Sequence, residues 1–234
     1  SECNHLEEVV FNSSPTTIDN FAFKDDDALV RIDLGDALIS LANLSFECKN
    51  FEGTIKLPAS LKDLKGSSFF SEKPINYELD SNNPYLKAHE GVIIAKDEDN
   101  NFNRIVPSSY DCGKNNNILS FGALSSDQYE IKTIDAFAFY NRPYIKEIHF
   151  SSTLSSLGEY CFSNCQALTS VNLKDTNITS IPIGCFSGSQ KLTSVNDSNY
   201  SDRYINGKLT GIGIEAFKDT ALTYLFLENE KIIS

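Results

Sequence analysis

Residues 145–162, IKEIHFSSTLSSLGEYCF, decide the fold, because their pattern of residue types returns along the whole chain. The pattern is an apolar triplet spaced i, i+3, i+5, an Ile or Leu about seven residues later, and then a small residue followed by Phe. The same pattern recurs at Leu6, Val9, Phe11, Ile18, Ala22 and Phe23, and at Leu168, Val171, Leu173, Ile181, Cys185 and Phe186. Self-similarity at a fixed period predicts a repeat architecture, in which each repeat is one structural unit.

The phenylalanines fix the length of the period. The repeat anchors are Phe23, Phe46, Phe69, Phe139, Phe162, Phe186 and Phe217, most of them 23 or 24 residues apart. A small residue precedes every anchor, and an Ile or Leu stands five residues before it. The gap of 70 residues between Phe69 and Phe139 and the gap of 31 between Phe186 and Phe217 indicate insertions.

A period of 20 to 29 residues that begins with a short alternating strand is typical of a leucine-rich-repeat solenoid. In such a turn Val171 and Leu173 point inward while Ser170 and Asn172 point outward, because side chains alternate along a strand. The anchor Phe fills the far side of the coil, and its burial is worth roughly 1.5–3 kcal/mol. We therefore expect an α/β leucine-rich-repeat solenoid with short strands and short helical or irregular segments.

The chain resembles the BspA-like class of leucine-rich repeats. The residues that carry the resemblance are LGEYCFSNC at 157–165 and IGIEAF at 212–217, and the likeness covers roughly residues 5–79 and 130–230. The resemblance implies a right-handed superhelix of turns of about 23 residues and a cell-surface or secreted protein.

We expect a single leucine-rich-repeat domain over 1–234, with N-terminal turns at 1–79, an insertion at 80–129 and C-terminal turns at 130–234. Within the first insertion, apolar runs at 92–95 and 102–106 flank a polar turn and predict a β-hairpin. The resemblance also implies this hairpin through Asn83, Pro84, Tyr85, Gly91, Val92, Ile93 and Pro107. A second insertion is expected at about 196–208.

Because the chain has no Met and no signal peptide, we expect a piece of a longer protein.

The charge and the hydropathy of the chain disfavour two kinds of partner, nucleic acid and the membrane interior. A net charge of −12 disfavours nucleic acid as a partner, since phosphate backbones are repelled. No apolar run approaches the roughly 18 residues of a membrane helix, so no membrane insertion is expected in this segment.

The six cysteines leave two alternatives open. Cys161 and Cys185 occupy equivalent small-residue positions on successive turns, where they are either buried free thiols or close enough for a disulfide. Cys3, Cys48 and Cys112 show no metal-ligand spacing, and no second pair or nearby His completes a zinc site with Cys165.

No recognised motif predicts catalysis. The three histidines do not pair with a nucleophile, and residues 97–108 lack the Gly and Glu of a calcium loop. We therefore expect no catalytic residue, no cofactor and no metal site, and hence no enzyme.

The outward strand positions are the candidate partner-binding residues. They are Arg31, Asp33, Glu147, His149, Tyr224 and Phe226, the last two on a strand expected over 222–227. Tyr224 and Phe226 form an exposed aromatic pair of the kind that dominates interfaces. Alternatively, a further turn or a second copy covers them, in an end-to-end or homodimer contact through the C-terminal turn.

Two functions remain in view. The first is a non-enzymatic recognition module at an extracellular or cell-surface location, similar to BspA-like proteins implicated in adhesion, with a host or other extracellular protein, or a glycan, as partner. The alternative is a structural spacer that projects other domains and has no ligand of its own. Aromatic or charged clustering on one face favours recognition, whereas a uniformly polar face favours the spacer.

Overall fold

The computed structural model describes residues 5–115, 117–121, 129–195 and 208–225. Cys3, Phe226 and nearly all of the insertion expected at about 196–208 lie outside these ranges. The chain forms two compact units, residues 1–110 and 111–234, each of which is described by itself. Within the described ranges the secondary structure consists of strands and turns, without an α-helix, so irregular segments complete each repeat.

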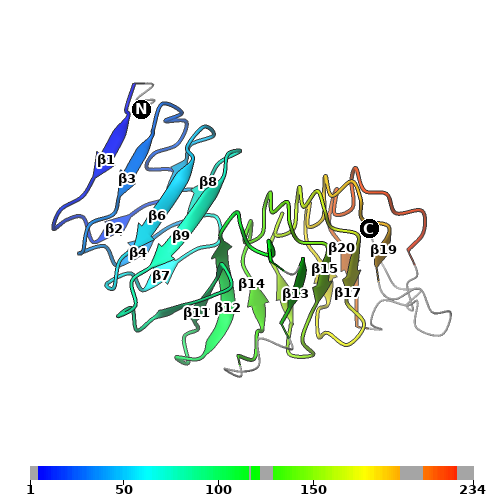
Figure 1. The fold of residues 1–234 in the computed structure, drawn as a ribbon. Coiled ribbons are helices and arrows are strands. Elements are labelled where there is room, and N and C mark those ends of the chain that lie inside the picture. Colours follow the sequence, from blue (N-terminus) through cyan, green and yellow to red (C-terminus); the bar gives the residue numbers. More distant parts are fainter. Residues whose placement is uncertain (1–4, 116, 122–128, 196–207, 226–234) are drawn as a thin grey trace. The chain divides into compact units, whose positions relative to one another are not determined.

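The first unit is a stack of parallel strands followed by an antiparallel meander (Figure 1). Its strands are β1 (Glu8–Val10), β2 (Thr17–Ile18), β3 (Arg31–Asp33), β4 (Ser40–Leu41), β5 (Phe46–Glu47), β6 (Gly53–Leu57), β7 (Asp63–Leu64), β8 (Phe69–Phe70), β9 (Ile75–Leu79), β10 (Leu86–His89), β11 (Val92–Lys96) and β12 (Phe102–Ser108).

Equivalent residues of successive turns lie opposite one another in this unit. Strand β1 pairs in parallel with β3, β6 with β9, and β5 with β8, while β2, β4 and β7 form a three-stranded sheet in that order. Ile18, Leu41 and Leu64 are in register across that sheet, and all three are buried. The 23-residue spacing of the sequence is therefore the length of one turn of the coil, and the solenoid prediction is confirmed.

The predicted β-hairpin is present as β11 and β12, which pair antiparallel. The sequence analysis did not predict β10, which pairs with β11 and makes a three-stranded meander. A two-residue turn, Glu90–Gly91, connects β10 to β11, and both residues have positive φ. That backbone geometry suits a tight hairpin turn, because it matches the twist of the flanking strands.

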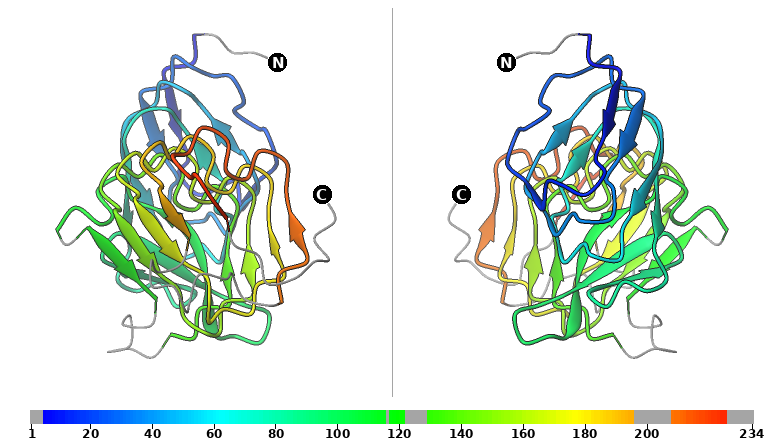
Figure 2. Two further views of the ribbon diagram at one scale, coloured as in Figure 1. Left: turned by 90° about the vertical axis from the view of Figure 1, so that its right-hand side faces the viewer. Right: turned by 90° about the vertical axis from the view of Figure 1, so that its left-hand side faces the viewer.

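The second unit repeats the parallel arrangement. Its strands are β13 (Ile118–Ser120), β14 (Thr133–Ile134), β15 (Glu147–His149), β16 (Ser156–Leu157), β17 (Ser170–Asn172), β18 (Ser180–Ile181), β19 (Ser194–Val195) and β20 (Gly211–Ile212). Strands β13, β15, β17 and β19 form one parallel sheet in that order, and β14–β16 and β18–β20 are further parallel pairs. Figure 2 shows these turns stacked one behind another.

The strand expected over 222–227 is not found in its described part. Residues 222–225 have no strand structure, and the rest of the expected strand lies outside the described ranges. An alternating apolar pattern predicts a strand, but a strand forms only where a neighbouring segment of backbone accepts and donates its hydrogen bonds.

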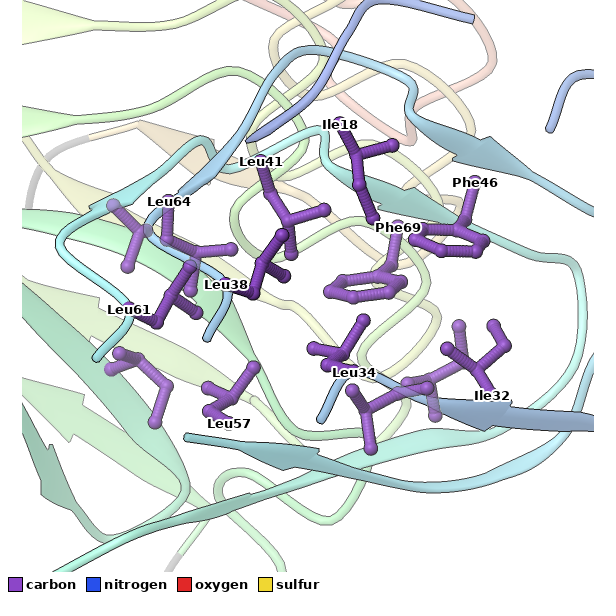
Figure 3. Packing of buried hydrophobic residues seen from close by; sticks show 14 of the residues in the cluster. Ile18, Ile32, Leu34, Leu38, Leu41, Phe46, Leu57, Leu61, Leu64 and Phe69 are labelled. Atoms are coloured by element: carbon purple, nitrogen blue, oxygen red, sulfur yellow. The ribbon is translucent and has the colours of Figure 1, made fainter. Parts of the chain in front are cut away.

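The core of the first unit is built from the repeated apolar positions (Figure 3). Leu38 and Leu61, which lie outside the strands, pack in one cluster with strand residues such as Leu57, and Phe46 and Phe69 belong to the same cluster. The rings of Phe23 and Phe46 stack with centroids 4.8 Å apart, and those of Phe46 and Phe69 with centroids 5.2 Å apart. Aromatic stacking of this kind adds about 0.5–1.5 kcal/mol per pair beyond area burial.

The second unit has its own stack of phenylalanines. Phe139, Phe162 and Phe186 are completely buried, with centroid distances of 4.9 Å between the first two and 5.7 Å between the last two. Phe217 continues the stack at 5.5 Å from Phe186 and is partly exposed. All seven anchor phenylalanines of the sequence therefore lie in two aromatic stacks, one in each unit.

Backbone hydrogen bonds join the turns beside these stacks. The amides of Phe139, Phe162 and Phe186 donate to the carbonyls of Cys161, Cys185 and Ala216, at 2.8, 2.9 and 2.8 Å. The turns approach so closely that a Cβ on Gly158 would lie 2.1 Å from the amide nitrogen of Ala136. The Leu-Gly dipeptide at 157–158 follows from that approach, since any other residue would collide with backbone.

Candidate recognition surface

The outward residues of the first unit carry charges that pair along the strands. The Arg31 guanidinium lies 3.3 Å from the Glu8 carboxylate on the neighbouring turn and 3.7 Å from Asp33 on its own strand. All three side chains are about half exposed. Exposed ion pairs of this type contribute roughly 0–1 kcal/mol to stability, so the chain does not depend on them for folding.

The corresponding surface of the second unit is less charged. Glu147 and His149 lie on β15, with the His149 Nε2 atom 3.4 Å from the Glu147 carboxylate. Their register partners on β17 are Ser170 and Asn172. On the other side, β13 places the exposed Ile118 opposite Glu147 and Ser120 opposite His149, so this sheet presents one Glu–His pair among polar and apolar neutral side chains.

The structure brings together two pairs of the predicted site residues, Arg31 with Asp33 and Glu147 with His149. The pairs belong to different units. Tyr224 is 57% exposed, whereas Phe226 lies outside the described residues, so the structure does not describe the aromatic pair as a pair.

A second surface, which the sequence analysis missed, runs along the turns that lead into the anchor phenylalanines. The residue two positions before an anchor has positive φ at Phe21, Leu44, Phe137, Tyr160, Gly184 and Glu215. For a residue with a Cβ this left-handed conformation costs roughly 1–2 kcal/mol, and it is rare for aromatic side chains. Aromatic residues at this position are therefore held there by contacts with their neighbours.

In the second unit these turns carry apolar side chains that we call the turn row: Phe137 and Tyr160 two positions before their anchors, Ile183 and Ile214 three positions before theirs, and Tyr140 directly after Phe139. The rings of Phe137 and Tyr160 stack with centroids 5.3 Å apart, and the ring of Phe137 meets that of Tyr140 edge-on at 5.8 Å. Ile214 is 74% exposed, and the other four residues of the row are partly exposed.

The Tyr160 ring depends on a glycine in the next turn. A Cβ on Gly184, which has a φ of +59°, would lie 2.1 Å from Tyr160 Cε1. The missing side chain leaves space for the ring to cover the backbone of the following turn. Repeated aromatic residues two positions before an anchor, at Phe21, Phe137 and Tyr160, are the sequence signal that could have found this surface.

Charged side chains border the turn row. Glu159, Glu215 and Asp219 are exposed, and Lys218 donates a hydrogen bond to Glu215 at 2.9 Å. This hydrogen bond and the charge of Glu215 raise the pKa of Lys218 above its ordinary value. Carboxylates therefore outnumber the single exposed ammonium group among these four side chains.

The buried cysteines are poorly suited to chemistry. Cys161 and Cys185 are free thiols whose sulfur atoms lie 3.5 Å apart in the core of the second unit. Burial raises the pKa of Cys165 to about 12 and that of Cys185 well above the ordinary value of a thiol. Since the thiolate is the reactive form, Cys165 and Cys185 are poor nucleophiles at neutral pH.

The described residues contain neither a metal-binding cluster nor a membrane-spanning helix. No group of three or more His, Cys, Asp or Glu side chains in these ranges is arranged to hold a metal ion. Nor does this part of the chain contain a helix with the length and apolar character that a membrane crossing requires.

Comparison with known proteins places the repeat in a family. The model of the BspA-type leucine-rich repeat region matches residues 1–89 and 115–234, in six copies. No curated protein matches the chain in sequence.

Solved structures share the fold. A leucine-rich cell surface protein from Faecalibacterium prausnitzii is 17% identical with a TM-score of 0.68, and the match covers 98% of this chain and 62% of that one. The pneumococcal vaccine antigen PcpA is 15% identical with a TM-score of 0.61, over 98% of this chain and 59% of that one. A leucine-rich repeat protein from Eubacterium ventriosum is 16% identical with a TM-score of 0.52, over 94% and 78%.

The match thus spans less than two thirds of the first two of these proteins. The likeness in structure concerns the fold, whereas the repeat model matches most of the sequence itself. The chain belongs to the BspA-type leucine-rich repeat family.

Proposed function

We propose that this chain is a non-enzymatic recognition module, exposed on an outer surface, that binds a protein or glycan partner through the surface of its solenoid. The observation that carries the proposal is the alignment of outward side chains in register across successive turns, as in Glu147 opposite Ser170 and His149 opposite Asn172. Rigid, extended surfaces of this kind are what solenoid proteins use for binding.

The proposed location rests on the relatives. The Faecalibacterium prausnitzii protein is described as a cell surface protein and the pneumococcal protein as a vaccine antigen. An extracellular or cell-surface position for this chain is consistent with both descriptions. It predicts that surface biotinylation of intact cells that make the parent protein labels this segment; labelling that needs cell lysis would contradict the location.

The proposed contact residues are the two strand pairs, Arg31 with Asp33 and Glu147 with His149, together with Tyr224 and Phe226. They are tested with an array of extracellular-matrix proteins and glycans, probed with the purified chain and with a repeat protein of equal charge as control. We expect a saturable signal above the control, which weakens in the double variants Glu147→Ala with His149→Ala and Tyr224→Ala with Phe226→Ala. An array without a saturable signal would count against recognition. Unchanged affinity in a variant would show that the substituted pair does not contribute to binding.

A spacer function is the second candidate, and one observation favours it. On the strand face of the first unit, Arg31 is already paired with Glu8 and Asp33, so these charges satisfy one another. A spacer predicts no saturable binding to any member of the array. It also predicts that another repeat segment of equal length replaces this one in the parent protein without loss of function.

An end-to-end or homodimer contact through the C-terminal turn is a further part of the proposal. Ile214 and Tyr224 are exposed in this turn, where a second copy would bury them. Sedimentation equilibrium of the chain over a range of concentrations tests the contact. Self-association that disappears in Tyr224→Ala is expected, and a monomer at all concentrations would contradict it.

A further inference from the structure

The position directly before an anchor phenylalanine is filled differently in the two units. In the first unit Ser45 and Ser68 stand there on two turns, and their hydroxyl groups donate to the backbone carbonyls of Ala42 and Leu41, at 2.7 and 3.0 Å. In the second unit the residues at this position, all of them buried, are in chain order Ala138, Cys161, Cys185 and Ala216. Two successive turns therefore carry a thiol where the turns on either side carry a methyl group.

The two thiols are in direct contact. The sulfur atoms of Cys161 and Cys185 lie 3.5 Å apart, and both side chains are completely buried. The sulfur atoms of a disulfide lie about 2.05 Å apart, so an approach of roughly 1.5 Å would join these two.

The backbone already holds the two turns at a spacing that a disulfide can bridge. The amide of Phe162 donates to the carbonyl of Cys185 at 2.9 Å, and the amide of Phe139 donates to that of Cys161 at 2.8 Å, which fixes the register of the turns. Neighbouring parallel segments lie about 4.8 Å apart. This spacing falls within the range of about 4.4–6.8 Å between the Cα atoms of disulfide-bonded cysteines. The bond therefore requires rotation of two side chains and no separation of the turns.

Two other buried thiols contact the backbone instead. The Sγ atom of Cys165 donates to the carbonyl of Phe139 at 3.2 Å, and that of Cys48 in the first unit donates to the carbonyl of Phe23 at 3.3 Å. Each of these cysteines thus bonds to the anchor of the preceding turn. Contact between two sulfur atoms distinguishes Cys161 and Cys185 from both.

We propose that Cys161 and Cys185 are a redox-modification site, which closes to a disulfide between adjacent turns when the chain meets a small disulfide such as oxidised glutathione. In the first step one cysteine thiolate attacks a sulfur of the oxidant, and one glutathione thiolate leaves. In the second step the other cysteine thiolate attacks the protein sulfur of the mixed disulfide, and the second glutathione leaves. The two cysteines lose two electrons, which the oxidant gains, and their two protons end on the two glutathione molecules.

Burial decides when this exchange occurs. It raises the pKa of Cys185, and both residues are 0% exposed in the folded chain. Because exchange needs an accessible thiolate, we expect it while the chain folds or when these turns open. The outer-surface location proposed above is an oxidising environment of the kind in which disulfides persist. Formation of the bond is nevertheless a property of the isolated chain and does not depend on the recognition function.

The disulfide would reinforce the aromatic stack at its side. It joins the turns whose anchors, Phe162 and Phe186, stack with centroids 5.7 Å apart. The two cysteines are 24 residues apart in the chain. A cross-link over a loop of this length restricts the unfolded chain and is expected to lower the equilibrium constant for unfolding on the order of 100-fold.

The test refolds the intact chain from urea in a mixture of oxidised and reduced glutathione. Remaining thiols are blocked with N-ethylmaleimide, and an unreduced tryptic digest is analysed by mass spectrometry. Cleavage after the lysines gives the peptide 147–174, which contains Cys161 and Cys165, and the peptide 175–191, which contains Cys185. We expect the two peptides to be joined with the loss of two hydrogen atoms, and to separate after reduction with dithiothreitol.

Alanine variants identify the cysteine of the first peptide that takes part. Cys161→Ala is expected to abolish the link, and alanine suits this position because Ala138 and Ala216 fill it on the flanking turns. Cys185→Ala should abolish it from the other turn. The matched control is Cys165→Ala, which removes an equally buried thiol and is expected to retain the link.

Complete alkylation of every thiol in the refolded parent chain would overturn the proposal. So would a link that is lost in Cys165→Ala and kept in Cys161→Ala. Circular dichroism of each refolded protein separates a failure to fold from a failure to link.

Urea denaturation with and without dithiothreitol measures the effect of the bond on stability. The parent chain and Cys165→Ala should unfold at a higher urea concentration when oxidised, whereas Cys161→Ala should unfold at the same concentration in both conditions. A linked chain whose midpoint is unchanged or lowered would contradict the reinforcement of the stack.

Discussion

At the scale of single residues, Asn83 shows how one side chain can hold a connection in place. Its Nδ2 donates to the carbonyls of Pro58 and Leu61, at 2.8 and 2.9 Å, and its Oδ1 accepts from the amides of Tyr85 and Leu86, both at 2.8 Å. The side chain is buried, with 2% of its surface exposed, and all four of its bonding positions are used. This geometry explains the Asn at position 83, directly before Pro84 and Tyr85 where the meander begins.

Replacing Asn83 by Asp is expected to lower the free energy of unfolding by about 3 kcal/mol or more. The carboxylate would face two carbonyl oxygens, and a buried, unpaired charge is costly. Urea denaturation followed by circular dichroism measures the change. The exposed neighbour Asn82 supplies the control, since Asn82→Asp should change the value by less than about 0.5 kcal/mol; equal effects of the two variants would contradict the four-bond account.

The buried thiols predict a pH dependence. Burial and nearby carboxylates raise the pKa of Cys48 to about 12, and burial raises that of Cys165 to about 12, from an ordinary value of 9.0. Between pH 9 and 12 the unfolded chain releases these protons while the folded chain keeps them. Stability is therefore complete below about pH 9 and falls as the pH rises, by up to about 1.4 kcal/mol per pH unit for each thiol.

The thiol contribution is separated from other titrating groups by comparison with Cys165→Ala. Tyrosines and lysines titrate over the same range, so only the difference between the two proteins is informative. The unfolding free energy of the variant should decline less steeply between pH 9 and 11 than that of the parent chain. Parallel slopes would show that Cys165 ionises equally in both states.

At the scale of elements, the aromatic stack is the feature that ties one turn to the next. Phe162 lies between Phe139 and Phe186, and Phe150 meets it edge-on at 5.7 Å. Phe162→Ala is expected to cost about 3–5 kcal/mol of unfolding free energy, because it leaves a cavity in a closely packed column. Thermal and urea denaturation measure this loss.

Val30→Ala is the control for the stack, since Val30 is 69% exposed and outside it. Its effect should stay within about 0.5 kcal/mol. A Phe162→Ala variant as stable as this control would show that the stack is dispensable for the fold.

The sequence predicted the elements whose positions depend on burial and period. The strands at 170–172 and 147–149, the anchor phenylalanines and the hairpin all lie where apolar spacing put them, because a repeated coil buries the same position in every turn. Strand β10 was missed because LKAH is short and only Leu86 in it is buried, and its pairing with β11 depends on a neighbour rather than on its own composition.

The site was less predictable than the fold. Outward strand positions follow from alternation, so Arg31, Asp33, Glu147 and His149 were placed correctly on their strands. The turn row was missed because its exposure depends on left-handed backbone at Phe137 and Tyr160, and apolar spacing does not report φ. The aromatic residues two positions before an anchor, Phe21, Phe137 and Tyr160, are the signal in the sequence that indicates it.

At the scale of the whole molecule, we propose that residues 1–234 form one leucine-rich-repeat domain. The family model supports this proposal, since its copies match residues on both sides of the meander. The measurement is differential scanning calorimetry of the intact chain, which should give one transition with equal calorimetric and van't Hoff enthalpies. Two separate transitions would show that the units at 1–110 and 111–234 unfold independently.

Recognition and spacing make opposite predictions for the free chain. A recognition module carries its binding surface within itself, whereas a spacer has no ligand of its own. The most direct measurement is competition: the purified chain is added in excess to cells that display the parent protein, and their attachment to the partner surface is counted. The account predicts a saturable loss of attachment that the charge-matched repeat protein does not cause; undiminished attachment at saturating chain would contradict it.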